Sequence, residues 1–164
     1  MKKLVLIFAA VVLLFSCKSR QNNTSFISDE YSIDSPCPPD GTCSLEVLQD
    51  KSLLIKEDDT GHLFYQLQDT DGKTVVIYKY QKKKNPNVTD SGYSEEVIFE
   101  TDNKSTDTID TNRMIFGVHC FCRGKAGYYK AGQATANFTN GKLYIELPNI
   151  VDGQKTKTIE VSFK

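Results

Sequence analysis

Four cysteines carry most of the chemistry that this sequence could support. Cys37 and Cys43 flank a short turn segment, while Cys120 and Cys122 form a CxC pair around Phe121. Cysteine pairs form disulfides, exchange electrons with other thiols, or bind soft metal ions. In an exported domain an even number of cysteines first predicts two disulfides, and four cysteines allow three ways of pairing.

Strand geometry favours one of these pairings. On a regular strand Cys120 and Cys122 point to one face with α-carbons about 6.5–7 Å apart, near or beyond the disulfide limit. Joining them needs a local break in the strand. Cys37 and Cys43 could close a small loop around residues 38–42, or each could reach one cysteine of the CxC pair. We predict the second arrangement, because it leaves neither a strained bond nor a free thiol. Each bridge would then close a loop of about 80 residues and contribute about 4 kcal/mol on the chain-entropy model.

The CxC pair also allows a redox or soft-metal site, with His119 beside it. A catalytic thiol pair usually lies at a helix N-terminus, where the dipole lowers the thiol pKa, and no helix is predicted here. On a regular strand His119 points away from Cys120 and Cys122, which spoils a three-ligand metal site. We therefore expect structural cysteines, with no metal and no cofactor.

Other catalytic patterns are missing from the sequence. His62 and His119 are the two histidines available for acid–base chemistry near neutral pH, and there is no GxSxG, HExxH or phosphate-binding glycine loop. Glu95 and Glu96 are neighbours that face opposite sides of a strand, so they cannot act as a carboxylate pair. Residues 69–72 contain part of a calcium-loop pattern, which a hairpin turn explains without an ion. We expect a protein that is not an enzyme.

The N-terminus carries an export signal. Lys2 and Lys3 precede an unbroken apolar run over residues 4–15, which is too short to span about 30 Å of hydrocarbon and matches the core of a signal peptide. The run ends in Leu-Phe-Ser directly before Cys17. This ending resembles the lipobox of bacterial lipoproteins, which implies removal of residues 1–16 and diacylation of the Cys17 thiol. Two or three acyl chains, at about 0.8 kcal/mol per buried methylene, would anchor the chain permanently.

The residues after Cys17 bear on its destination. Lys18 stands where an aspartate would indicate inner-membrane retention by the enterobacterial rule, so we expect the outer membrane. Residues 18–23 lack the acidic cluster that resembles a surface-export signal in some Bacteroidota lipoproteins, which favours the periplasmic face. Residues 17–36 are rich in Ser, Asn, Gln and Asp without an apolar period. They predict a flexible lipidated tether before a single domain at 37–164.

Composition argues against nucleic-acid binding. Without the 16-residue leader, 148 of the 164 residues remain, which is enough for one domain with a real core. Cleavage of the leader takes away two lysines and no acidic residue, so the net charge falls from −1 to −3. Nucleic-acid binding needs a concentrated basic face. The run at residues 82–84 is the only basic cluster, and it lies at a predicted strand end.

Apolar residues recur with a period of two almost everywhere after residue 36, and no window of eleven residues has a helical stripe. We predict ten strands, at residues 44–49, 52–57, 62–69, 73–82, 93–100, 113–122, 128–134, 135–139, 142–147 and 157–163. Short strands with one apolar face each favour an all-β fold, an antiparallel β-sandwich or a flattened barrel of about 8–10 strands.

Two candidate turns set the strand register. If residues 71–72 (Asp-Gly) are a two-residue hairpin turn, opposing positions sum to 143, and Leu67 faces Val76. If residues 140–141 (Asn-Gly) are another, opposing positions sum to 281. Each register gathers apolar residues on one face, and a slip of one residue would scatter them.

Residues 101–112 are polar and rich in Asp and Thr, which predicts a long exposed loop. Within it, residues 107–109 (Asp-Thr-Ile) resemble the short O-glycosylation motif of Bacteroidota secreted proteins, with Thr108 as the acceptor. A three-residue pattern has little specificity, and an unmodified loop is the simpler interpretation.

From these signals we predict a lipid-anchored envelope protein whose disulfide-stapled β domain has a binding or structural role. One alternative is a lipocalin-like carrier, with the sheet closed around an apolar cavity for a small ligand. The other is a thiol–disulfide oxidoreductase or metal binder that uses Cys120 and Cys122. A packed interior favours the binding or structural role, and a cavity favours the lipocalin-like carrier. The pairing and accessibility of the CxC thiols test the oxidoreductase or metal-binding alternative.

Overall fold

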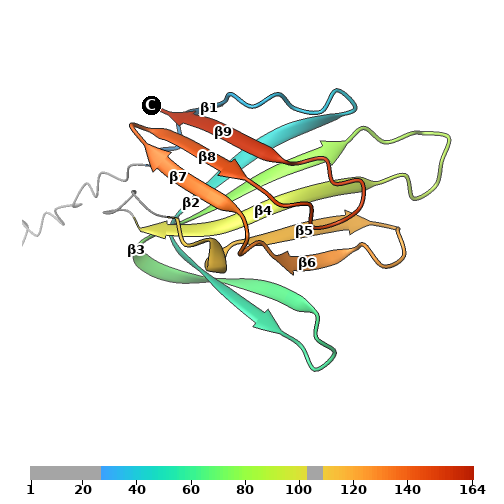
Figure 1. Ribbon diagram of the computed structural model, residues 1–164, viewed down its shortest axis with the longest axis horizontal. Coiled ribbons are helices and arrows are strands. Elements are labelled where there is room, and N and C mark those ends of the chain that lie inside the picture. Colours follow the sequence, from blue (N-terminus) through green and yellow to red (C-terminus); the bar gives the residue numbers. More distant parts are fainter. Residues whose placement is uncertain (1–26, 103–108) are drawn as a thin grey trace, which may run out of the picture.

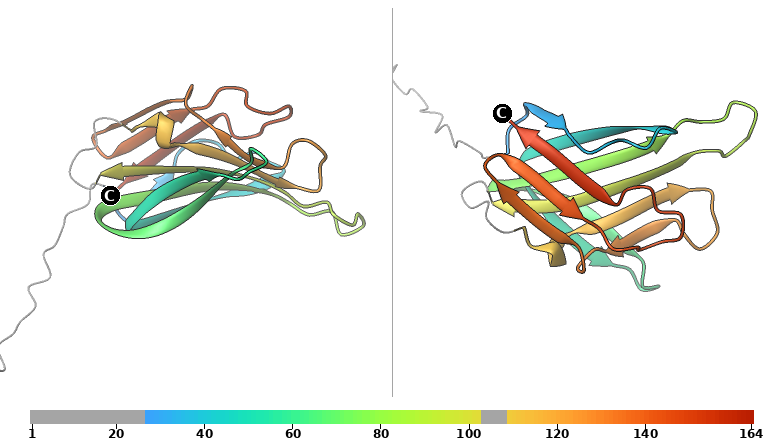
Figure 2. Two further views of the ribbon diagram at one scale, coloured as in Figure 1. Left: turned by 90° about the horizontal axis from the view of Figure 1, so that it is seen from below. Right: turned by 45° about the horizontal axis from the view of Figure 1, so that its top comes forward.

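The computed structural model describes residues 27–102 and 109–164 (Figure 1). In these ranges the regular structure consists of nine β-strands and one 3-10 turn, Thr111–Arg113. The strands form two antiparallel sheets that pack against each other (Figure 2). The predicted all-β antiparallel sandwich is therefore confirmed. Cys17 and Thr108 lie outside the described residues.

The smaller sheet contains four strands. In spatial order they are β1 (Tyr31–Ile33), β9 (Thr158–Phe163), β8 (Lys142–Glu146) and β7 (Thr135–Thr139). Asn140 and Gly141 join β7 to β8 with φ angles of 52° and 75°, as a type I′ hairpin turn requires. Phe138 pairs with Leu143, so opposing positions sum to 281 and the predicted register is confirmed.

The larger sheet contains five strands. In spatial order they are β2 (Gly41–Glu57), β3 (Leu63–Lys82), β4 (Tyr93–Asp102), β5 (Ile115–Cys120) and β6 (Gly127–Lys130). The distal part of the β2–β3 hairpin, residues 51–69, bends away from the rest and is called the arm below (Figure 1). At the start of β3, within the arm, Leu63 pairs with Tyr128 of β6. The arm therefore reaches the strand at the far edge of the same sheet.

The predicted hairpin turn at residues 71–72 is wrong. β3 continues without interruption through this dipeptide, and the hairpin turn lies at residues 58–61 instead. The pairing of β2 with β3 shifts at Asp50, whose side-chain Oδ1 accepts a hydrogen bond of 3.1 Å from the N–H of Gly72. Both residues have positive φ angles, 53° and 78°. A β-bulge uses a residue with a positive φ angle, as a two-residue hairpin turn does. The Asp-Gly pair at residues 71–72 therefore marks the bend at which the arm begins.

The described structure begins before residue 37, where the tether was expected to end. Tyr31–Ile33 pairs with β9, and the Tyr31 hydroxyl donates a hydrogen bond of 2.5 Å to the carbonyl of Leu45. Ile27 is only 2% exposed. Residues 27–36 therefore pack as part of the domain. The sequence did not indicate this, because a strand of three residues shows too little periodicity to be recognised. The two described ends of the predicted exposed loop over 101–112 are not fully exposed: Thr101 is a buried residue of β4, and Ile109 is buried as well.

The larger sheet is buried on both faces. Toward the smaller sheet, Tyr80, Phe99 and Phe116 are fully buried and fill much of the space between the sheets, as in a packed sandwich. On the opposite face a second cluster forms beneath the arm. Its buried members are Leu53, Val75, Ile77, Ile98 and Ile115. The middle strand β4 is consequently enclosed along nearly its whole length.

Because β4 is enclosed, the carboxylates of Glu95, Glu96 and Glu100 are buried as well. A buried charge is costly unless it is paired and hydrogen-bonded. Glu100 Oε2 accepts hydrogen bonds from the N–H of Leu53, at 2.8 Å, and from Arg113 Nη2, at 2.9 Å. Arg113 also donates to the carbonyl of Leu53. The Glu100–Arg113 ion pair thus satisfies the N–H and the carbonyl of Leu53 on the edge strand β2. Unpaired backbone groups on an edge strand can otherwise pair with a strand of another molecule.

Glu96 is held on the arm side of β4. Its Oε1 accepts a hydrogen bond of 2.7 Å from the Tyr128 hydroxyl and lies 2.7 Å from His119 Nε2. Burial raises the pKa of the Glu96 carboxyl, but the hydrogen bonds from His119 and Tyr128 outweigh it and leave the pKa below its usual value. The Tyr128 ring reaches Glu96 by crossing Gly117 and packs edge-on against Tyr65 of the arm.

Substituting Gly117 with alanine should destabilise the fold by about 1–3 kcal/mol, the usual cost of overpacking. A Cβ at this position would lie 2.7 and 2.9 Å from two carbons of the Tyr128 ring. The free energy of unfolding from urea denaturation measures the effect. Gly92→Ala is the matched control, because a Cβ there lies 4.0 Å from its nearest neighbour.

Replacing Tyr128 with alanine in the Gly117→Ala background should remove the part of this penalty that comes from the ring, while the 3.0 Å approach to Glu96 Cγ remains. Equal costs for Gly117→Ala with and without the Tyr128 ring would show that the ring does not require the glycine.

Candidate functional site

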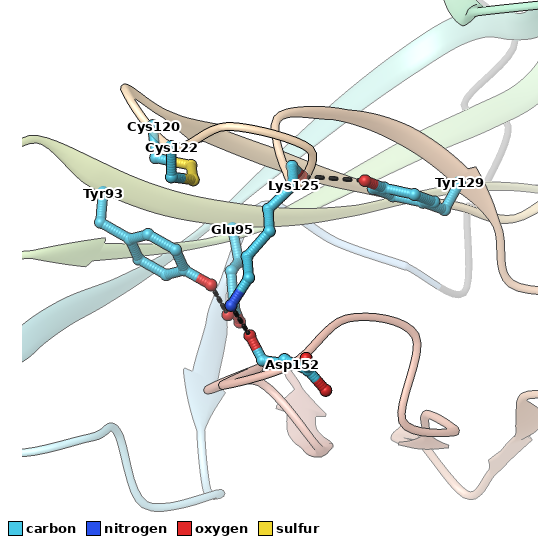
Figure 3. Close-up of a disulfide and its surroundings, with 7 residues drawn as sticks. All are labelled: Tyr93, Glu95, Cys120, Cys122, Lys125, Tyr129 and Asp152. Carbon is cyan, nitrogen blue, oxygen red and sulfur yellow. Dashed lines mark hydrogen bonds between the residues drawn. A yellow bond between two sulfur atoms is a disulfide. The ribbon is translucent and has the colours of Figure 1, made fainter.

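The structure pairs each cysteine with its near neighbour in sequence. Disulfides join Cys37 to Cys43 and Cys120 to Cys122, with α-carbon separations of 5.7 and 5.2 Å. The predicted long-range bridges between the two pairs are therefore wrong. β5 ends at Cys120, and the chain bends at Phe121 before reaching Cys122 (Figure 3). This bend is the local break in the strand that pairing within a CxC motif requires.

Both disulfides lie at one end of the sandwich. Cys43 on β2 is opposite Tyr80 on β3, and Cys120 on β5 is opposite Tyr93 on β4. We call this end the loop end, because the segments 83–92 and 121–126 connect strands there (Figure 1). The C-terminus lies at the opposite end, where the N–H of Lys164 donates to the carbonyl of Glu30.

Glu95 joins the two sheets at the loop end. Its side chain is fully buried, and Oε1 accepts hydrogen bonds from the Tyr93 hydroxyl, at 2.5 Å, and the N–H of Lys155, at 2.7 Å. Oε2 accepts a hydrogen bond of 2.6 Å from the N–H of Thr156. Burial and the bond to Glu95 hold the pKa of Tyr93 well above its usual value. One carboxylate thus connects β4 to the segment between β8 and β9.

Neighbouring polar contacts fasten the remaining loops. The Tyr80 hydroxyl donates a hydrogen bond of 2.8 Å to Asp40, and burial together with this bond raises the pKa of Tyr80 to about 12. Lys125 Nζ donates to the carbonyl of Asp152, and the Tyr129 hydroxyl donates to the carbonyl of Lys125 (Figure 3). The loop that contains Cys122 is therefore held to the smaller sheet and to β6 by contacts independent of its disulfide.

Phe121 is the most exposed large apolar side chain among those described, at 86%. It stands between two surface hollows. One, of about 590 Å³, is bounded by the segment 83–92, Tyr93 and His119; the other, of about 290 Å³, is lined by residues 120–123. Val88, 52% exposed, also lines the larger hollow. The loop end thus presents an aromatic ring beside open concave surface.

The two disulfides differ in what they enclose. On the chain-entropy model, closing the seven-residue loop from Cys37 to Cys43 contributes about 2.4 kcal/mol, and closing the three-residue loop around Phe121 about 1.6 kcal/mol. Cys37 and Cys43 both pack against the main core, whereas of the second pair only Cys120 does. The Cys120–Cys122 bond is therefore the weaker contributor to stability and the one that packs less against the core.

The other predicted candidates do not assemble into a site. Glu95 and Glu96 face opposite sides of β4, as predicted. His119 contacts Glu96 on the face away from the Cys120–Cys122 disulfide. His62 lies in the exposed turn of the arm, with Nδ1 2.6 Å from the Thr60 hydroxyl. Among the described residues no group of three or more His, Cys, Asp and Glu side chains is placed to hold a metal ion.

The sequence reasoning missed Glu95 and Phe121. The signal for Glu95 is its position in the segment 93–99, where acidic residues interrupt an otherwise strongly apolar strand. The exposure of Phe121 has no sequence signal of its own. An aromatic residue between two cysteines on a predicted strand is equally compatible with a place in a core.

Comparison of the chain with protein-family models, with curated proteins and with solved structures finds no match. No helix in residues 27–102 or 109–164 has the length and apolar character needed to cross a bilayer. Any functional assignment therefore rests on the sequence signals and on the geometry of the loop end.

Substituting Glu95 with glutamine should destabilise the domain by about 2–4 kcal/mol. A glutamine amide keeps one oxygen and places an NH2 group against a backbone N–H, so a buried donor loses its acceptor. Chemical denaturation followed by tyrosine fluorescence measures the change. Glu160→Gln is the control, since Glu160 is an exposed glutamate on β9. A loss equal to that of the control would mean that Glu95 does not join the sheets.

Proposed function

We propose that this chain is a lipid-anchored protein of the bacterial cell envelope, attached at the outer membrane on its periplasmic face, that binds a polypeptide partner with its loop end. The observation that carries the binding role is the 86% exposure of Phe121 beside two surface hollows. The lipid anchor rests on the leader and on the lipobox-like residues before Cys17.

The position of the loop end suits a tethered protein. The first described residues lie beside the C-terminus, at the end of the sandwich away from the segments 83–92 and 121–126 (Figure 1). An anchor attached upstream of Ile27 therefore leaves the loop end directed away from the attachment point. This orientation makes Phe121 available to molecules in the periplasmic space.

Phe121 has the properties of a binding anchor. Aromatic side chains at the centre of an interface supply much of the binding energy, because they bury a large apolar surface with few rotatable bonds. Disulfide closure and the β5 pairing restrict the backbone on both sides of Phe121, so less conformational entropy is lost on binding. The surrounding hollows offer both apolar groups, such as Val88, and polar ones, such as Asn85 and Ser91. This mixture suits a peptide segment.

The anchor predicts a change in fractionation. Cys17→Ser, in a chain whose residues 1–16 are replaced by a leader that is cleaved without lipidation, should move the protein from the membrane fraction to the soluble fraction, because no thiol is left to carry acyl chains. Mass spectrometry of the wild-type N-terminal peptide should show a chain that begins at Cys17 with acyl mass. Recovery of a membrane-bound Cys17→Ser protein, or of an unmodified Cys17, would contradict the anchor.

The binding role predicts position-specific crosslinking in living cells. A photoreactive phenylalanine analogue at position 121 should capture a distinct exported polypeptide, and Val88→Asp in the same protein should reduce the yield severalfold. The matched control is the same analogue at Phe64, which is 37% exposed on the arm. Identical products from both positions, or none at position 121, would exclude the loop end as the binding surface.

A further inference from the structure

We propose that the Cys120–Cys122 disulfide is a reversible redox group that exchanges with a dithiol of an exported polypeptide, while Cys37–Cys43 is a permanent structural bridge. The proposal uses the same loop end as the binding role. Exchange can nevertheless be measured with the purified domain and a model dithiol, without the natural partner.

The fold does not depend on this disulfide. Cys120 is the last residue of β5, which is paired by its backbone to β4 on one side and β6 on the other. The loop beyond it is held by the Tyr129–Lys125 and Lys125–Asp152 hydrogen bonds (Figure 3). Opening the disulfide frees only the short connection at Phe121. The oxidised and reduced forms can therefore share one fold, which a redox group needs in order to cycle.

The disulfide is also open to attack. Cys122 lies beyond the end of β5 and is half-exposed, and residues 120–123 line the 290 Å³ hollow beside it. Both cysteines are partly buried, but only Cys120 packs against the main core, so we assign the attacked sulfur to Cys122. Solvent-accessible disulfides are among those that thiols reduce readily.

The exchange is a balanced transfer of two electrons. A thiolate of the partner dithiol attacks Cys122 Sγ, the Cys120–Cys122 bond breaks, and Cys120 leaves as a thiolate that takes up a proton. The second partner thiol, after losing its proton, attacks the partner sulfur of this mixed disulfide and releases Cys122 as a thiolate, which is protonated in turn. The partner is oxidised to a disulfide, and Cys120 and Cys122 are reduced to thiols. The reverse sequence reduces a partner disulfide.

The partner chemistry follows from the surroundings of the sulfur. Phe121 stands beside Cys122 and offers an apolar contact to the residues that flank an incoming cysteine. The site therefore fits a polypeptide with two cysteines near apolar side chains. Such a segment is exposed in an exported protein before its disulfides have formed, and it is hidden afterwards.

The first experiment compares the two disulfides within one molecule. The purified mature chain, with Cys17→Ser to remove its thiol and with both disulfides formed, is equilibrated in glutathione buffers of increasing reducing power. Free thiols are then alkylated and assigned by mass spectrometry. Cys120–Cys122 should be reduced with an equilibrium constant at least tenfold larger than that of Cys37–Cys43, while the circular dichroism spectrum stays unchanged. Reduction of both bridges together, or only on unfolding, would overturn the proposal.

The second experiment identifies the reactive sulfur. Each single variant, Cys120→Ser and Cys122→Ser, is mixed with a disulfide-linked peptide dimer that carries phenylalanine beside its cysteine. The free Cys122 of the first variant should form the mixed disulfide at least tenfold faster than the free Cys120 of the second. Equal rates, or faster reaction at Cys120, would contradict the assignment.

A third measurement separates this proposal from the binding role. In cells, the double variant Cys120→Ser/Cys122→Ser is crosslinked from position 121. If the disulfide is inert in glutathione and position 121 still captures its partner, the redox proposal fails and the binding role stands. If the disulfide exchanges but position 121 captures nothing, the reverse holds.

Discussion

The carboxylates of β4 are the constraint on which the described fold depends. The strand is enclosed on both faces, so each carboxylate must find hydrogen-bond donors inside the protein or lose several kcal/mol. Glu95 takes two N–H groups from the segment between β8 and β9, Glu96 takes the Tyr128 hydroxyl, and Glu100 takes Arg113 and the N–H of Leu53. Four separate parts of the chain are therefore positioned by one strand.

This arrangement separates stability from chemistry at the loop end. Glu95 and the polar contacts of Tyr80 and Lys125 hold the loops in place, so the small disulfide loop around Phe121 contributes little to the stability of the fold. The same contacts keep Phe121 in a defined place on the surface. A rigid support under an exposed aromatic residue and an accessible sulfur is what a binding or exchange site requires.

The particular successes and failures of the sequence reasoning have physical causes. The turn at residues 140–141 was predictable because a two-residue I′ turn and the alternation of its strands give the same register. The Asp-Gly at residues 71–72 failed because a bulge and a turn need the same backbone conformation. Leu67 and Val76 face Leu53 and Val47 in β2, so their apolar pairing is satisfied without the predicted hairpin. The cysteine pairing failed because the end of β5 at Cys120 has no sequence signal.

The sequence by itself determined the all-β class and the opposite orientations of Glu95 and Glu96, because periodicity involves neighbouring residues only. The proposed export and lipid attachment also rest on a local motif in the sequence. The tertiary structure decided which cysteines pair, how the arm bends, and that Phe121 is exposed while Glu95 is buried. These outcomes depend on contacts between segments far apart in the chain, such as Glu95 with residues 155–156, and no local pattern encodes which distant donors will meet a given carboxylate.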